Sequence, residues 1–177
     1  MDFATHVIFI LLVVILYRLF ESVDKGDAML MVLLVSIGVA VALGNLLQRF
    51  APLVLLGRAD YLSVFTQPQL EAMALDSLGF RRSGAAVPML FWGLWLLPFG
   101  TLVIKSGFLP RVLGVLLLIA GFAYLTTGTT SVVFPEHMGV VSRFMIPLYF
   151  GEVPIIFWFL IKGVTVASQQ ARPSHFS

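Results

Sequence analysis

The single carboxylate inside a long apolar stretch of this sequence is Glu152, in the segment Gly151-Glu152-Val153-Pro154. A charged carboxylate at the centre of a membrane helix costs about 2.5–3.5 kcal/mol on insertion scales, so we expect it to face the interior of a helix bundle. With a helical rise of about 1.5 Å per residue, Glu152 lies roughly 15 Å from Lys162, which we place at the membrane surface. Glu152 is therefore the first candidate for a functional side chain.

Hydroxyl groups at the same depth are the expected partners of Glu152. On an antiparallel helix over residues 112–133, the same depth falls close to residues 122–124, which include Tyr124, and on the helix over residues 84–104 it falls near Trp95. Thr127 follows one helical turn later on that helix. We therefore predict that Tyr124 and Thr127 donate hydrogen bonds to Glu152.

A second polar group consists of Asn45, Gln48 and Arg49, which share one helical face because they are three and four residues apart. On the same scale, Arg49 lies roughly 15 Å from Glu152 in depth, which is too far for a direct ion pair. Two interpretations of these polar residues are open. They are buried, hydrogen-bonded contacts that stabilise the protein, or they line a polar cavity for a proton, an ion or a ligand.

The sequence contains no pattern that predicts a catalytic residue, a metal or a cofactor. The three histidines, His6, His137 and His175, are dispersed and do not have the spacing of metal ligands. The absence of cysteine excludes disulfides, thiol catalysis and cysteine-based metal sites. Nucleotide-binding glycine motifs and the hydrolase motif Gly-x-Ser-x-Gly are also missing. The sequence therefore favours a protein without catalytic activity.

The elements that position these residues follow from composition. The chain is 59% apolar and 11% charged, whereas a soluble protein is about 45–50% apolar and about 25% charged. A membrane helix needs roughly 20 mostly apolar residues. Five stretches meet this requirement, at 3–20, 28–50, 84–104, 112–133 and 144–161. The sequence thus predicts an all-α polytopic membrane protein with one helical domain over 1–164 and a flexible tail over 165–177.

One short helix is expected outside the five spans, over residues 67–79. The segment Thr66-Gln67-Pro68-Gln69 has the pattern of a capping box, and apolar residues then recur on one face. We predict that this helix lies at the membrane interface. A signal peptide is the alternative for 3–20, but Asp2 stands where such a peptide carries bases.

Basic residues give a weak indication of orientation. With five spans, the N-terminal side carries five bases and the opposite side carries six. Because Arg49 falls within a span and the loops of the opposite side are flanked by bases, we predict a cytoplasmic C-terminus and a location in the cell inner membrane. The net charge is only +2 and the bases are scattered, so no nucleic-acid partner is predicted.

Small residues recur at intervals that suit close helix packing. The stretch 84–104 contains Gly93 and Gly100, and the stretch 112–133 contains Gly114, Gly121 and Gly128, all at intervals of seven. Ser36, Ala40 and Gly44 recur every four residues in the second span. These stripes pack helices within one chain, or one of them forms the seam of a homodimer.

Several segments resemble one known family of membrane proteins. These are FWGLWLLPFG at 91–100, KSGFLPRVLG at 105–114, WFLIKG at 158–163, DYLS at 60–63 and LYRLF at 16–20. They resemble the bacterial family called domain of unknown function 4386. The resemblance implies a bacterial multi-pass membrane protein and implies no activity. Members usually carry a further membrane helix before the point where this chain begins, so the resemblance also implies that the chain lacks the family's first membrane helix.

Three functions remain as hypotheses. The leading one is a small integral membrane protein without catalytic activity that acts through membrane lipids, a homo-oligomer or another membrane protein. The second is a transporter of a small solute, or a proton-coupled carrier, centred on Glu152. The third is a membrane enzyme that modifies a lipid. A water-accessible polar cavity at Glu152 would favour the second, and a second titratable group beside Glu152 at a lipid-accessible opening would favour the third.

Overall fold

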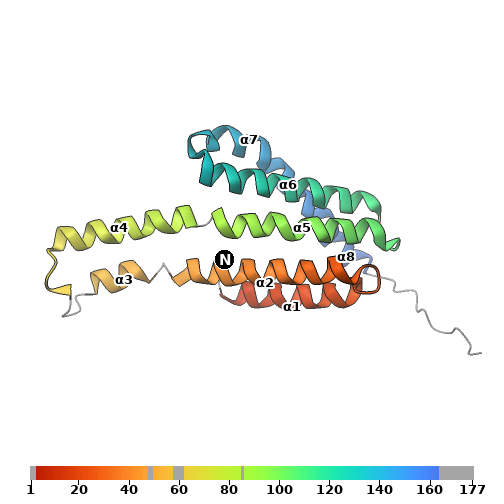
Figure 1. Ribbon diagram of the computed structural model, residues 1–177, viewed down its shortest axis with the longest axis horizontal. Coiled ribbons are helices and arrows are strands. Elements are labelled where there is room, and N and C mark those ends of the chain that lie inside the picture. The colour runs from red at the N-terminus through yellow and green to blue at the C-terminus, as the bar shows by residue number, and fades with distance from the viewer. Residues whose placement is uncertain (1–2, 48–49, 58–61, 85, 164–177) are drawn as a thin grey trace, which may run out of the picture.

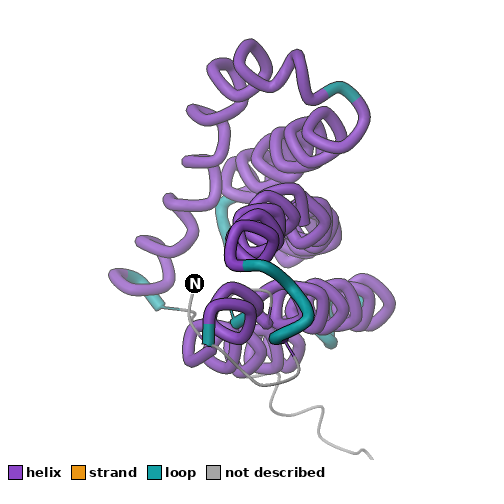
Figure 2. The backbone as a smooth tube through the Cα atoms, turned by 90° about the vertical axis from the view of Figure 1, so that its left-hand side faces the viewer, coloured by secondary structure: helices purple, strands orange, loops and turns teal. Residues whose placement is uncertain are grey.

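The computed structural model describes residues 3–47, 50–57, 62–84 and 86–163, and these residues form helices joined by short loops (Figure 2). The all-α class predicted from the sequence is confirmed, since the described residues contain no strand. The helices are α1 (Phe3–Phe20), α2 (Lys25–Leu47), α3 (Ala51–Leu56), α4 (Gln67–Gly84), α5 (Ala86–Ser106), α6 (Arg111–Val133), α7 (Met138–Tyr149) and α8 (Val153–Ile161). Two 3-10 turns, η2 (Pro135–His137) and η3 (Phe150–Glu152), precede α7 and α8.

Five helical segments of the described residues are long and apolar enough to cross a membrane. They are Phe3–Phe20, Lys25–Leu56, Ala86–Ser106, Arg111–Val133 and Pro135–Ile161. Large apolar side chains on several helices point outward, among them Ile8, Leu33 and Phe122. Such a surface is costly in water and is what a lipid environment requires. The described residues therefore have the helices and the apolar surface that a multi-pass membrane protein needs.

Helix α5 is the central element of the bundle. Figure 1 shows α2 on one side of α5 and α6 on the other, with α1 packed against α2. Side chains from each of these helices form one apolar core, and Phe20, Met31, Leu96 and Leu117 are completely buried in it. Burial of these residues fixes the rotation of each helix, and that rotation decides which polar groups face inward.

The predicted glycine stripes of α5 and α6 lie against each other. A Cβ atom added to Gly100 would lie 2.8 Å from the carbonyl oxygen of Gly114, and one added to Gly121 would lie 3.0 Å from that of Gly93. Gly128 has the same kind of close contact with the Leu90 side chain. The two backbones therefore approach so closely that only glycine fits at the crossing. The five glycines of these two stripes therefore pack α5 against α6 within one chain.

The small residues of α2 have different surroundings. Ser36, Ala40 and Gly44 are exposed, and nothing lies within 4 Å of a Cβ atom added to Gly44. The hydroxyl of Ser36 donates to the carbonyl of Val32 in its own helix. A homodimer seam remains a prediction, and of the three stripes that of α2 has the exposure it needs.

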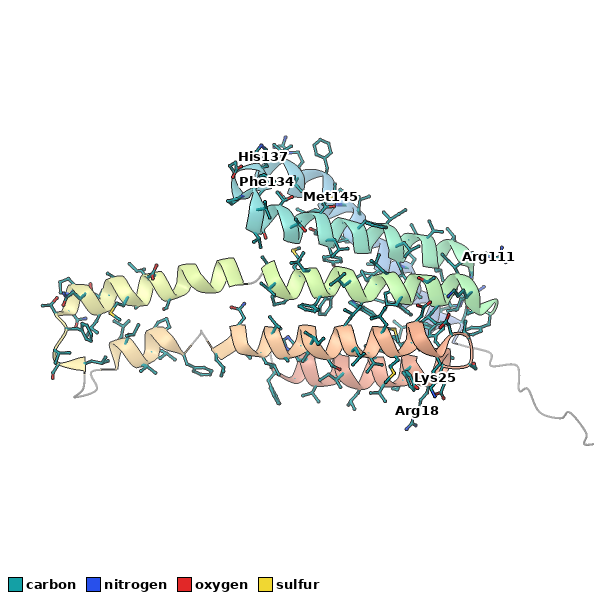
Figure 3. All side chains as sticks on the ribbon, in the orientation of Figure 1. Arg18, Lys25, Arg111, Phe134, His137 and Met145 are labelled. Carbon is teal, nitrogen blue, oxygen red and sulfur yellow. The ribbon has the colours of Figure 1, made fainter. Side chains whose placement is uncertain are left out.

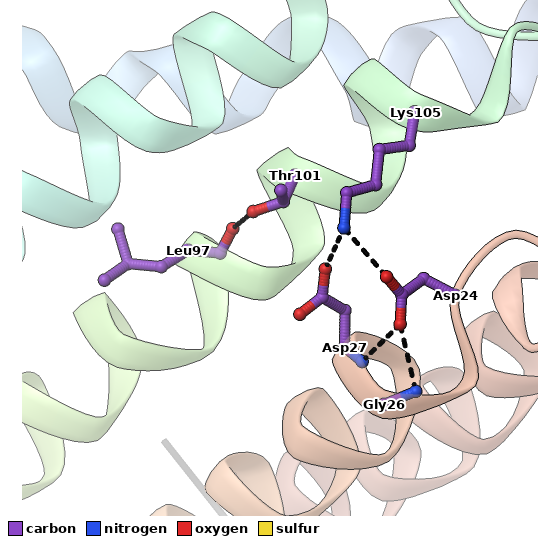
Figure 4. A network of polar contacts seen from close by, with 6 residues as sticks. All are labelled: Asp24, Gly26, Asp27, Leu97, Thr101 and Lys105. Atoms are coloured by element: carbon purple, nitrogen blue, oxygen red, sulfur yellow. Dashed lines mark hydrogen bonds and ion pairs between the residues drawn. The ribbon is translucent and has the colours of Figure 1, made fainter.

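The turn between α1 and α2 is fastened to the end of α5 (Figure 4). The Asp24 carboxylate caps α2, because one of its oxygens accepts hydrogen bonds from the backbone N–H groups of Gly26 and Asp27, each at 3.1 Å. Lys105 Nζ lies 2.8 Å from Asp24 and 2.9 Å from Asp27. Lys105 holds the pKa of Asp24 below its ordinary value. This network fixes the register between α2 and α5 at one end of the bundle.

Helix α4 begins where the capping box predicts. The Gln69 side chain accepts a hydrogen bond of 2.9 Å from the backbone N–H of Thr66, and α4 starts at the next residue. The helix continues to Gly84, beyond the predicted range 67–79. In Figure 1, α4 follows roughly the line of α5 and packs beside α3. The placement of α4 at the membrane interface stays a prediction. An interfacial helix lies along the membrane surface, so α4 would have to turn away from the direction of α5 to adopt it.

The fifth segment differs most from the sequence prediction of one helix over 144–161. It begins at Pro135, and it is divided into α7 and α8 by the turn η3. Pro154 has no N–H with which to bond the carbonyl of Phe150, and the N–H of Val153 bonds that carbonyl instead. This shorter connection is the 3-10 turn, and it ends on Glu152.

Charged residues mark one end of the bundle. Figure 3 shows Arg18, Lys25 and Arg111 at the end opposite to His137. The sequence assigns these three bases to the side opposite the N-terminus. The arrangement is therefore the one that five consecutive crossings produce.

Candidate functional site around Glu152

The break in the fifth segment holds Glu152 against α6. A Cβ atom added to Gly151 would lie 2.6 Å from the carbonyl oxygen of Leu116, so the backbone of η3 touches the backbone of α6. Glu152 follows directly and is partly buried. The carboxylate is therefore positioned by backbone contact rather than by a flexible loop.

The Glu152 carboxylate accepts a hydrogen bond from the hydroxyl of Tyr124, and the two oxygens are 2.8 Å apart. The Trp92 side chain lines the same cavity as the carboxylate. No lysine, arginine or histidine of the described residues forms an ion pair with Glu152. Glu152 therefore has a neutral hydrogen-bond donor, Tyr124, and no cation of the described chain beside it.

A second tyrosine supports the first. The rings of Tyr124 and Tyr149 are stacked, with centroids 4.2 Å apart and an angle of 7° between the planes. The Tyr149 hydroxyl donates to the hydroxyl oxygen of Thr127 at 2.6 Å, and Thr127 donates to the carbonyl of Ala123 at 2.9 Å. Thr127, predicted as a donor to Glu152, thus contacts the site through Tyr149 and is not bonded to the carboxylate.

Glu152 and Tyr124 lie on the wall of a cavity of about 460 Å³, which we call the Glu152 cavity. Its other walls come from α1, α2 and α5, and they are mainly apolar. A second pocket of about 390 Å³ lies between α1, α5 and α8. Phe9, Trp92, Trp95 and Glu152 line both, so the two spaces share one aromatic wall with a carboxylate on it.

The aromatic wall is built by contacts between α1 and α5. Phe9 stacks on Trp92 with a centroid distance of 4.6 Å, and its ring stands edge-on to Trp95 at 5.3 Å. Trp95 then stacks on Phe99, also at 5.3 Å. Trp95 Nε1 is buried and has no hydrogen-bond partner among the described residues. Each ring of the wall is therefore packed against a neighbouring ring.

The remaining residues predicted for a polar site do not join Glu152. Asn45 lies beside Gly84 at the end of α4, and it is not among the residues that line the Glu152 cavity. Gln48 and Arg49 lie outside the described residues. Whether this second polar group has a role of its own stays a prediction.

Several lining residues were not connected with Glu152 from the sequence. They include His6, which is buried, and Phe9 and Trp92. Trp95, which the estimate of depth places level with Glu152, lines the same cavity, and Trp92 shares its helical face because it lies three residues earlier. His6 stands near the chain start and alone, so no spacing could have connected it with Glu152.

The site does not have the composition of a metal centre. Within the described part of the chain, no three histidine, aspartate or glutamate residues are close enough together to hold a metal ion. The groups at Glu152 offer hydrogen bonding, proton exchange at the carboxyl group and contact with aromatic rings.

Comparison with known proteins identifies the family of this chain. The model of the family described as "Domain of unknown function (DUF4386)" matches residues 1–163. The chain belongs to this family. One similar member, named "Uncharacterized protein", comes from Archaeoglobus fulgidus and is 27% identical over 168 residues, covering 93% of this chain and 99% of the relative. No solved structure matches the chain. The family resemblance read from the sequence is thus confirmed, while a bacterial origin and the absence of a first helix stay predictions.

Proposed function

We propose that this DUF4386 protein is a non-catalytic membrane protein that binds a membrane-soluble amphiphile, such as a lipid or a lipid-like solute, in the Glu152 cavity. The observation that carries this proposal is the cavity of about 460 Å³ with an apolar wall and a single carboxylate. Ligand pockets typically measure about 300–1,000 Å³ and combine apolar walls with a few polar groups. The Glu152 cavity has both properties.

Labelling with a neutral probe tests occupancy of the cavity without assuming a charge on the ligand. We expect a fatty alcohol that carries a diazirine to crosslink, on illumination in lipid nanodiscs, to peptides of α1, α2 and α5 that line the cavity. Excess unlabelled fatty alcohol should compete, because a defined cavity saturates whereas a lipid-exposed surface does not.

A pair of substitutions on α2 provides the control. Ala42 lines the Glu152 cavity, whereas Ala40 is exposed on the same helix. Ala42→Phe should fill the space and abolish competed labelling, and Ala40→Phe should leave it unchanged. The proposal is refuted if labelling spreads over the exposed apolar surface without competition, or if both substitutions have the same effect.

A second candidate function is proton-coupled transport, which the broken fifth segment favours. Transporters place ion and substrate sites where membrane helices are interrupted, and Glu152 is the last residue of such an interruption. In proteoliposomes, this candidate predicts a proton flux that Glu152→Gln abolishes while the protein remains folded. A flux that survives Glu152→Gln would show that Glu152 does not carry the proton. No flux with either protein would leave binding without transport.

For the cellular setting, we propose the inner membrane as the location and the cytoplasm as the side of the C-terminus. The charged end that contains Lys105, Asp24 and Asp27 would then face the cytoplasm. This assignment rests on the base-flanked loops of that end, since bases favour the cytoplasmic side.

A further inference from the structure

We infer that the amphiphile bound at Glu152 carries a positive charge, and that the ligand class is an ammonium group attached to an apolar body. This inference rests on the proposed function and specifies the chemistry of its ligand. It depends on three features of the Glu152 cavity, which are the charge of the carboxylate, the rings around it and the apolar remainder of the wall.

The first feature is a carboxyl group to which the described residues bring no positive charge. Tyr124 supplies a neutral donor to Glu152, and no described basic residue forms an ion pair with it. Burying a carboxylate away from water is expensive unless a positive charge or several donors compensate. An ammonium ligand supplies the missing positive charge at the place where the chain does not.

The second feature is the arrangement of aromatic rings. Phe9, Trp92 and Trp95 form one wall beside Glu152, and Tyr124 adds a ring on the side of α6. Aromatic faces attract cations, tryptophan most strongly, and cages of such rings are a common way to bind ammonium groups. The negatively polarised faces of the same rings do not attract an anion.

The third feature is the apolar remainder of the cavity, which fits an alkyl chain and not a hydrated inorganic cation. Side chains of α2 such as Leu34, Val35 and Val39 complete the wall. A small metal cation would need several oxygen ligands, and the wall offers the carboxylate and one tyrosine hydroxyl as its oxygens from side chains. His6 also lines the cavity, and its imidazole supplies no oxygen for such a cation.

Tryptophan fluorescence can report binding at the cavity directly. The chain contains three tryptophans, of which Trp92 and Trp95 line the cavity. In a Trp158→Phe background, the fluorescence comes from these two alone. Bromine quenches indole fluorescence on contact, so 11-bromoundecylamine, 11-bromoundecanol and 11-bromoundecanoic acid compare three head groups on one chain. Titrations in nanodiscs are compared at equal probe concentrations in the lipid.

We expect the amine to quench at a concentration at least about tenfold lower than the alcohol, with the acid weakest. Glu152→Gln should remove the preference for the amine, so that amine and alcohol quench at similar concentrations. Glu136→Gln changes an exposed acid away from the cavity and should preserve the preference. The three probes are also compared on the protein that retains Glu152. That comparison needs no cavity variant, so a folding defect of Glu152→Gln would not hide the result.

Two results would overturn the inference. The first is that the alcohol binds as tightly as the amine when Glu152 is intact. The second is that the preference for the amine persists in Glu152→Gln. If the neutral diazirine probe still labels the cavity in a manner sensitive to Ala42→Phe, the proposed function stands and the positive charge alone is wrong.

Nanodiscs with phosphatidylethanolamine separate two sources of the ammonium group. Competition by this lipid assigns the site to an aminolipid, and unchanged affinity assigns it to a freely diffusing amine.

Discussion

The contact between α5 and α6 gives a prediction whose magnitude follows from the structure. In Gly100→Ala, the new Cβ atom would lie 2.8 Å from the Gly114 carbonyl oxygen and 2.9 Å from the Leu118 Cγ atom. Carbon–oxygen contacts between helices are ordinarily about 3.3–3.6 Å, so the helices must separate by roughly 0.5–0.8 Å. Overpacking of this kind costs about 1–3 kcal/mol.

The matched control is Gly44→Ala on α2, where nothing lies within 4 Å of the added Cβ atom. Both substitutions gain the same helix propensity, about 0.5–1 kcal/mol, because alanine loses less backbone entropy than glycine. The difference in unfolding free energy between the two variants therefore isolates the packing cost. We expect Gly100→Ala to be less stable than Gly44→Ala by about 1–3 kcal/mol.

Thermal unfolding in detergent, followed by circular dichroism, measures this difference. At about 2–4 °C per kcal/mol for a chain of this size, Gly100→Ala should unfold roughly 2–12 °C below Gly44→Ala. The double variant Gly100→Ala/Gly114→Ala should cost less than the sum of the single variants, because one separation of the helices relieves both contacts. Equal unfolding temperatures for Gly100→Ala and Gly44→Ala would refute the close contact of α5 and α6.

Three further predictions concern the charged end, the tyrosines and the topology. The pKa of Asp24 is lowered below its ordinary value of 3.8, chiefly by the hydrogen bond from Lys105, so its contribution to stability is present above that value and is lost as the pH falls through the lowered pKa. Unfolding temperatures measured from pH 6 downward should therefore fall less in Asp24→Asn than in the unsubstituted protein, and equal losses would contradict the role of Asp24. Tyr124→Phe should destabilise the protein more than Tyr149→Phe, because it leaves a partly buried carboxyl group without its donor, a loss of about 1–3 kcal/mol, whereas Tyr149→Phe removes a bond between two hydroxyls that contributes about 0.5–1.5 kcal/mol; a larger loss in Tyr149→Phe would show that the carboxyl group does not depend on its donor. Reporter fusions after Lys105 should report the cytoplasm and a fusion near Gln69 the opposite side, and the same side for both would exclude a crossing by α5.

Much of the fold could be predicted because it depends on local composition. Long apolar stretches specify membrane helices without any knowledge of the tertiary structure, and Thr66 with Gln69 specifies the start of α4. The glycine stripes of α5 and α6 were visible for a similar reason, since small residues at intervals of seven have few uses other than close packing. Their pairing, Gly93 with Gly121 and Gly100 with Gly114, required the structure.

The candidate site could be predicted only in part. An estimate of depth along straight helices named Tyr124, and the structure places its hydroxyl 2.8 Å from Glu152. The same estimate could not distinguish Thr127, which is buried and bonded within its own helix. The form of the break at η3, a 3-10 turn that ends on Glu152, could not be predicted from hydropathy, which does not register a missing N–H. Pro154 indicates a kink, but whether it becomes a 3-10 turn depends on the contact of Gly151 with α6.

The glycine contact and the candidate site are linked by helix geometry. On α5, Gly93 lies between Trp92 and Trp95 in the sequence, so the residue that sets the distance to α6 is next to those that form the aromatic wall. On α6, Tyr124 follows Gly121 by one helical turn and therefore lies on nearly the same face. A separation of α5 from α6 would consequently move the Tyr124 hydroxyl and Glu152 away from the tryptophans. Close packing at the glycines is thus the condition under which carboxylate and rings can contact one ligand.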